Sequence, residues 1–231
     1  MIVRVADGVA GAVSFEESHG PIVVIDALRM SATVIVALDL GMEVIPVATV
    51  EEAMAVKDKG GLTAGERGGK RLSELDLGNS PTALLALERS SGDLSGKALA
   101  LTTSNGVPAL LAVADHSGAV LIGSPLNLSA LATRIKREAP QELSLLLAGV
   151  TGGKAAQEDA VTASLLLQRL DESISSALPF PVPVGDLETL FLSTPSGKKL
   201  VSFGYEEDVR LCASVDRYPV VPVFRQGRIT V

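Results

Sequence analysis

The sequence has little of what several protein classes require. A single cysteine, Cys212, excludes an internal disulfide and fits a reducing compartment, so we expect a cytoplasmic protein. Tryptophan is absent and aromatic residues make up only 3% of the 231 residues, although 47% are hydrophobic. The core must therefore consist of aliphatic side chains, which pack well in parallel sheets covered by helices.

Common catalytic motifs are also missing. There is no Gly-x-x-x-x-Gly-Lys-[Ser/Thr] loop of a P-loop NTPase and no His-Glu-x-x-His zinc motif. The two histidines, His19 and His116, lie outside the polar motifs, and no Cys-x₅-Arg loop surrounds Cys212, so histidine and cysteine chemistry are not expected. Asp26 stands where a haloacid-dehalogenase-type phosphatase has its aspartyl nucleophile, but Leu28 replaces the second aspartate of such enzymes.

Long apolar runs and an excess of positive charge are absent too. Runs such as Ile22–Ile25 and Leu143–Val150 are far shorter than the roughly 20 residues that a bilayer requires. The net charge of −7 argues against a nucleic-acid partner. We expect neither a membrane nor a nucleic acid as partner, and an anionic ligand would need a locally positive pocket or a bridging metal.

Apolar, β-branched segments alternate with helical patterns along most of the chain, which is typical of a largely parallel sheet with helices on both faces. The expected strands are Ile22–Ile25, Val44–Val47, Leu62–Ala64, Ala98–Thr102, Ala119–Ile122 and Leu143–Leu147. The expected helices are Ala32–Leu40, Val50–Lys59, Pro81–Arg89, Val107–Ala114, Leu128–Glu138 and Glu158–Leu170.

The C-terminal part follows a different pattern. Three prolines in Ser173–Asp186 predict a linker or long loop, which divides a main core, residues 1–172, from a segment, residues 173–231. That segment contains a predicted helix, Glu206–Val215, and a predicted hairpin that turns at Gln226-Gly227. We expect it to pack on the same domain as the main core.

Polar clusters follow the predicted strands, where ligands bind in alternating α/β folds. They are Asp26–Thr33, Gly65–Gly69, Asp76–Pro81, Thr102–Gly106 and Glu158-Asp159. Each also has a structural explanation: Asp26 and Asn79-Ser80 can cap helices, Gly65–Gly69 is a turn, and Glu158-Asp159 can complement a helix dipole. Their recurrence at nearly every strand end nevertheless predicts one shared site.

The residue types in these clusters suit binding of an oxyanion and a hard metal ion. Arg29 and Arg67 carry guanidinium groups that can bind phosphate or sulfonate oxygens through two hydrogen bonds. Hydroxyls and backbone N–H groups in Thr102–Ser104 can hold an oxyanion at a helix start. Asp26, Glu66, Asp76, Glu158 and Asp159 supply the oxygen ligands that Mg²⁺ prefers.

The ordered motifs resemble those of the 2-phosphosulfolactate phosphatase family. The resemblance is carried by Val24–Arg29, Gly65–Gly69, Asp76–Pro81 and Thr102–Gly106, with similar segments at Val44–Val47, Leu121–Ser124, Glu158-Asp159 and Asp208–Asp216. This sequence has Met30-Ser31-Ala32-Thr33 where the family commonly has Ala-Thr-Ser-Thr. It also has Thr102-Thr103-Ser104-Asn105-Gly106-Val107 where the family commonly has Thr-Thr-Thr-Asn-Gly-Thr.

The resemblance implies a three-layer α/β/α fold with a mixed sheet and a Mg²⁺-dependent phosphatase. The implied reaction converts 2-phospho-3-sulfolactate to 3-sulfolactate, a step of coenzyme M biosynthesis in methanogenic archaea. Two alternatives stay open: a phosphatase for another small phosphorylated carboxylic acid, and a non-catalytic anion-binding protein. A homo-oligomer is compatible with either.

The motifs and the resemblance together predict the roles of individual residues. Predicted catalytic residues are Asp26, Glu66, Asp76, Asn79 and Asn105. Predicted substrate-binding residues are Arg29, Ser31, Thr33, Arg67, Ser80, Thr102, Thr103 and Ser104. Predicted Mg²⁺ ligands are Asp26, Glu66, Glu158 and Asp159. Phosphate transfer through a covalent aspartyl intermediate and transfer directly to water both remain open.

Overall fold

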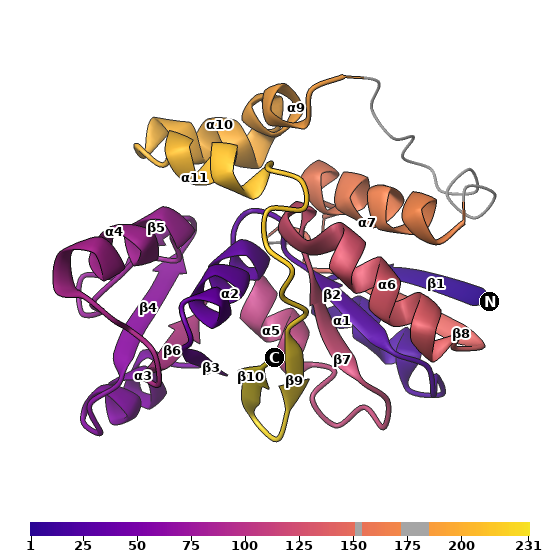
Figure 1. The fold of residues 1–231 in the computed structure, drawn as a ribbon, viewed down its shortest axis with the longest axis horizontal. Coiled ribbons are helices and arrows are strands. Elements are labelled where there is room, and N and C mark those ends of the chain that lie inside the picture. The colour runs from indigo at the N-terminus through magenta and orange to yellow at the C-terminus, as the bar shows by residue number, and fades with distance from the viewer. Residues whose placement is uncertain (151–153, 172–184) are drawn as a thin grey trace.

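The computed structural model describes residues 1–150, 154–171 and 185–231 (Figure 1). Within these residues the chain forms a ten-stranded sheet with the strand order β1-β8-β2-β7-β9-β10-β3-β6-β4-β5. The strands are β1 Ile2–Asp7, β2 Ile22–Ile25, β3 Glu43–Pro46, β4 Leu62–Arg67, β5 Lys70–Arg71, β6 Ala98–Thr102, β7 Val120–Gly123, β8 Glu142–Leu147, β9 Val223–Arg225 and β10 Arg228–Thr230.

The sheet has two parallel parts joined by an antiparallel hairpin. Strands β1, β8, β2 and β7 pair in parallel in one part, and β3, β6 and β4 pair in parallel in the other. The C-terminal hairpin β9–β10 lies between them, antiparallel to β7 and to β3. The predicted hairpin and the predicted mixed, mostly parallel sheet are therefore confirmed.

Helices cover both faces of this sheet. The helices are α1 Gly8–Gly11, α2 Met30–Asp39, α3 Val50–Lys57, α4 Pro81–Ser91, α5 Gly106–Leu111, α6 Leu128–Glu138, α7 Gln157–Leu170, α9 Leu187–Ser193, α10 Pro195–Ser202 and α11 Glu206–Cys212, with 3₁₀ turns η1 Ala12–Phe15 and η2 Pro125–Asn127. Every helix in the described residues is too short or too polar to cross a bilayer.

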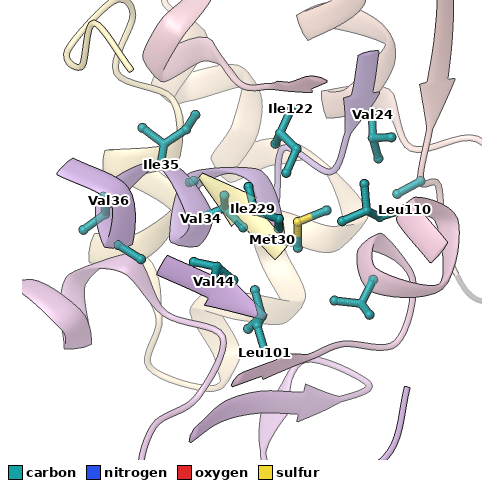
Figure 2. Close-up of a cluster of buried hydrophobic side chains, with 14 of the residues drawn as sticks. Val24, Met30, Val34, Ile35, Val36, Val44, Leu101, Leu110, Ile122 and Ile229 are labelled. Carbon is teal, nitrogen blue, oxygen red and sulfur yellow. The ribbon is translucent and has the colours of Figure 1, made fainter. Parts of the chain in front are cut away.

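Strand β2 shows how the layers are built, because successive side chains of a strand point to opposite faces. Ile22 and Val24 pack in the core that contains residues of α2 and α5, whereas Val23 and Ile25 pack with α6 and α7. Figure 2 shows Met30, the first residue of α2, among side chains from several strands and α5. The predicted three-layer α/β arrangement is confirmed.

Most predicted interior elements are confirmed, some with shifted ends. Strand β6 and helix α6 match the predicted ranges residue for residue. Strand β1 and helices α9 and α10 were not predicted. The expected linker at 173–186 and the boundary at residue 173 fall mainly on 172–184, outside the described residues. After this region α9, α10 and α11 pack against one another, and α11 also contacts α4 (Figure 1).

Candidate active site

A cavity of about 300 Å³ lies where both parallel parts of the sheet meet the C-terminal helices. Asp26 follows β2, Gly149 follows β8, Glu66 lies in β4 and Ser104 follows β6. Helix α7 contributes its first turn, and α10 contributes residues from Pro195 onward. Several strand ends therefore converge on one space, as the positions of the polar clusters predicted.

Asp26 has an environment that opposes its ionised form. It is 7% exposed, and its backbone N–H donates a hydrogen bond of 3.0 Å to Ser31 Oγ. Burial, followed in size by the charge of Glu66 and more weakly that of Glu158, raises the pKa of Asp26 from 3.8 to about 7. A Cβ on Gly106 would lie 2.2 Å from Asp26 Oδ2, so any side chain at this position would force the carboxylate to shift.

Helix α7 begins with two buried acids that differ in their hydrogen bonding. Asp159 Oδ1 accepts the N–H of Ala27 at 2.8 Å, and Oδ2 accepts that of Gly149 at 3.0 Å. Glu158 is 2% exposed, and its Oε2 has no hydrogen-bond partner in the described part of the chain. Burial, then the charges of Asp26 and Glu158, raises the pKa of Asp159 above its ordinary value.

Glu66 connects two loops through backbone N–H groups. Its Oε2 accepts the N–H of Gly69 at 2.5 Å, and its Oε1 accepts that of Ser104 at 2.6 Å. Gly68 and Gly69 have φ values of 59° and 88° and form the two-residue turn between β4 and β5, a conformation that favours glycine. Glu66 therefore fixes this turn against the loop that follows β6.

Arg29 is a buried cation with several partners. It is 2% exposed, and its Nη1 donates to Asp208 Oδ2 at 2.6 Å. Its Nη2 donates to the carbonyl of Gly69 at 3.0 Å, and the guanidinium carbon lies 4.2 Å from the ring centre of Tyr205. Both Asp208 and Tyr205 come from the C-terminal part of the chain, which therefore orients an arginine that follows β2.

The whole cavity lies within a region that matches known proteins. Residues 11–227 match the family model described as 2-phosphosulpholactate phosphatase. A 2-phosphosulfolactate phosphatase of Methanothermobacter thermautotrophicus is 37% identical over 222 residues, covering 94% of this chain and 92% of that protein. The chain belongs to the 2-phosphosulfolactate phosphatase family. The resemblance inferred from the motifs is thus confirmed.

Bacterial members of the 2-phosphosulfolactate phosphatase family are similar over comparable lengths. A probable 2-phosphosulfolactate phosphatase of Thermotoga maritima is 34% identical over 212 residues, with 89% of each chain covered. One from Thermus thermophilus is 32% identical over 223 residues, covering 90% of this chain and 89% of that protein.

The structure brings together eight of the residues predicted from the family motifs. They line the cavity and are Asp26, Arg29, Glu66, Asn79, Ser104, Asn105, Glu158 and Asp159. Asn79 is 3% exposed, and its Oδ1 has no hydrogen-bond partner among the described residues. Two buried side-chain oxygens, from Asn79 and Glu158, are thus left for a ligand.

Two charged residues of the motifs lie outside the described lining of the cavity. Asp76 accepts hydrogen bonds from Lys57 Nζ at 2.5 Å and from Thr63 Oγ1 at 2.8 Å. Partial burial raises the pKa of Asp76, but these hydrogen bonds outweigh it and the net pKa is lowered. Arg67 is exposed and donates to the carbonyl of Glu66 and to Thr102 Oγ1, at 2.8 and 3.0 Å.

The other predicted hydroxyls also lie outside that lining, at buried positions. Ser80 begins α4, where its Oγ accepts the N–H of Ala83, and Thr103 Oγ1 accepts the N–H of Val107 in α5. Thr33 lies within α2, and its Oγ1 has no partner in the described residues. Ser31 accepts from Asp26 as described, so the hydroxyls of Ser31, Ser80 and Thr103 hold the surrounding backbone rather than line the cavity.

The sequence analysis missed two contributions from the C-terminal part. Helix α10 lines the cavity with Pro195, Ser196, Lys199 and Leu200. Helix α10 begins as α4 does, with a hydroxyl residue directly before a proline. Thr194 is that residue, and its Oγ1 accepts the N–H of Gly197 at 3.0 Å. Asp208 was noted only within a family-like segment, yet it also accepts hydrogen bonds from Ser80 and Thr82.

The cavity offers oxygen ligands suited to a metal, the cofactor that membership of this phosphatase family suggests. Within the described residues no group of three or more histidine, cysteine or acidic side chains forms a ready coordination set. Glu66 and Asp159 accept backbone N–H groups, whereas Glu158 Oε2 is buried without a partner and Asp26 lies near it. A small divalent cation can be held by one or two carboxylates while water and substrate oxygens complete its shell, so these two carboxylates suit such an ion.

Proposed function

We propose that this chain hydrolyses 2-phospho-3-sulfolactate to 3-sulfolactate and phosphate with the help of Mg²⁺. The observation that carries the proposal is the cavity in which Asp26 and Glu158 lie with Arg29, in a chain that matches the family over residues 11–227. Paired carboxylates would repel an anionic ligand unless a cation lay between them, which favours metal-assisted chemistry over simple anion binding.

Asp26 and Glu158 are the proposed metal ligands. A divalent cation held between them would relieve their mutual repulsion in a buried site and would favour the ionised form of Asp26. Bound Mg²⁺ supplies charge screening for the phosphate and lowers the pKa of a coordinated water. Glu66 and Asp159, the other predicted ligands, position the loops around them through backbone N–H groups.

Arg29 is the proposed phosphate-orienting cation. Asp208 and the carbonyl of Gly69 each take one of its N–H groups, so the guanidinium is held in a fixed orientation at the cavity. Preorganised donors stabilise developing charge at no further cost in reorganisation. Asn79, Ser104 and Asn105 line the same space and are proposed to contact the substrate, and Asp26 serves as metal ligand or nucleophile.

We also infer a cytoplasmic enzyme whose partner is a small anionic substrate. The net charge of −7 disfavours nucleic acid, and the single cysteine, Cys212, is buried and free.

Phosphate release from a panel of substrates tests the proposal. The panel contains phosphosulfolactate, other phosphorylated carboxylic acids and 4-nitrophenyl phosphate, each with and without Mg²⁺. We expect phosphosulfolactate to have the highest kcat/KM and turnover to require the metal. A higher kcat/KM for another phosphorylated acid would reassign the substrate, and release from none of them would contradict phosphatase activity.

A further inference from the structure

The basic side chains of the cavity differ in whether they are already paired. Among its described lining residues, two are basic: Arg29, which is bonded to Asp208 and to the carbonyl of Gly69, and Lys199. The side chain of Lys199 is exposed, and its ammonium group has no hydrogen bond or ion pair to any described residue. A cavity rich in carboxylates thus contains one cation whose charge no described group neutralises.

The position of Lys199 is fixed by the packing of α10. Pro195, Ser196, Lys199 and Leu200 all line the cavity, and they share one face of this helix because residues four positions apart are neighbours on a helix surface. A Cβ built on Gly69 would lie 3.6 Å from Leu200 Cδ2, which shows that the helix packs on the β4–β5 turn.

The ammonium group lies beside this same turn. A Cβ built on Gly68 would be 3.9 Å from Lys199 Nζ. Gly68 donates its N–H to Ser104 Oγ, and Gly69 offers its carbonyl to Arg29. The β4–β5 turn therefore lies beside both basic residues, the paired Arg29 and the unpaired Lys199. The carboxylates of the cavity come from the end of β2, from β4 and from α7.

We propose that Lys199, with the hydroxyl of Ser196, forms a subsite for the second anionic group of the substrate, a sulfonate or carboxylate. The inference rests on the proposed function and narrows it to phosphorylated organic acids that carry at least one further negative charge. The second anionic group keeps its charge while phosphate is transferred, so an ammonium that binds it stabilises the ground and transition states about equally. Its loss should therefore raise KM more than it lowers kcat.

Steady-state kinetics with two substrates test this subsite. For Lys199→Ala we expect kcat/KM for phosphosulfolactate to fall about 10- to 100-fold, mainly through KM, because one ion pair is lost. The kcat/KM for 4-nitrophenyl phosphate, which lacks a second anionic group, should change less than about twofold. Lys199→Arg keeps the charge and should recover most of the loss.

Lys198→Ala provides the matched control, because Lys198 is the exposed neighbour on the same helix and lies outside the described lining. This substitution should leave kcat/KM for both substrates unchanged. An equal fall in kcat/KM for both substrates in Lys199→Ala, or no fall for either substrate, would overturn the proposed subsite. If wild type prefers another phosphorylated acid, the proposed substrate is wrong. A selective loss of kcat/KM on that acid in Lys199→Ala would still support the subsite, and no selective loss would contradict the subsite.

Discussion

Asp26 lies at the end of a strand whose four residues are all buried, where an ionised carboxylate is costly. The raised pKa of about 7 follows first from burial and then from the charges of Glu66 and Glu158. Buried carboxylates with a strongly raised pKa occur mostly at functional sites, because metal binding and proton transfer require them. Asp26 is therefore the residue from which the proposed function is most directly tested.

The pKa of Asp26 predicts how stability changes with pH in the metal-free protein. The folded pKa of about 7 lies above the ordinary pKa of an aspartate, 3.8, so the native state binds this proton more tightly than the unfolded state. The stabilisation is present below about pH 4 and is lost as pH rises through 7. The raised pKa of Asp159 acts in the same direction.

Urea unfolding of the EDTA-treated protein at pH 5 and pH 8 measures this effect. We expect the free energy of unfolding of Asp26→Asn to fall less between these pH values than that of wild type. Mg²⁺ should restore wild-type stability at pH 8, because it binds the ionised carboxylate. Parallel pH dependence of the two proteins would contradict the assigned environment of Asp26.

Replacing Cys212 with serine tests whether its buried thiol has only a structural role. Burial, and then the charge of Asp208, raises its pKa, which opposes formation of a nucleophilic thiolate. Cys212→Ser should keep kcat/KM within about threefold and lower the free energy of unfolding by about 1–3 kcal/mol, because a hydroxyl is buried instead. Inactivity of a variant with a native circular dichroism spectrum would favour thiol chemistry instead.

At the scale of elements, glycine at position 106 lets the start of α5 lie close to Asp26, the residue that follows β2. A Cβ there would lie 2.2 Å from Asp26 Oδ2 and 2.7 Å from Met30 Cβ. The carboxylate can shift, but the Cβ of Met30 belongs to a packed helix and cannot move alone. Added volume at this position should therefore displace Asp26 within the cavity.

Gly106→Ala is expected to remain folded with its free energy of unfolding lowered by about 1–3 kcal/mol, the usual cost of overpacking. We expect kcat/KM to fall at least about tenfold, because a shift of about 1 Å at a reacting group is costly. Kinetics at saturating Mg²⁺, compared with thermal unfolding, separate the two effects. Full activity would show that the contact does not position Asp26.

The elements also explain which predicted residues reach the cavity. Neighbouring residues of a strand point in opposite directions, so once Glu66 of β4 faces the cavity, Arg67 must point away from it. The strand predicted from the sequence ends at Ala64, so the alternation separates Glu66 from Arg67 only once the strand is known to extend to Arg67. The pairing of Asp76 with Lys57 could not have been predicted, because it depends on how α3 packs against the sheet.

At the scale of the molecule, the sequence predicted local elements well but not the order of the strands in space. The apolar run of β2 and the glycine turn of the C-terminal hairpin each carry a local pattern. The position of that hairpin between β7 and β3 depends on long-range pairing, such as that of Ile229 with Val44, which no local pattern encodes. Lys199 was missed for the same reason, since its contribution depends on where α10 packs.

The central claim is that Asp26 and a divalent metal carry out phosphate release in this cavity. The most direct measurement is phosphate release from phosphosulfolactate by wild type, Asp26→Asn and the control Asp58→Asn, an exposed position at the end of α3. Each protein is assayed after EDTA treatment and after addition of Mg²⁺. Asparagine keeps the shape of aspartate and removes its charge, so a structural role would survive the change.

The account predicts that Asp26→Asn loses at least about a hundredfold in kcat/KM while remaining folded. It also predicts that wild type and Asp58→Asn are inactive in EDTA and recover with Mg²⁺. Normal turnover by Asp26→Asn, or full wild-type activity after prolonged dialysis against EDTA, would contradict it.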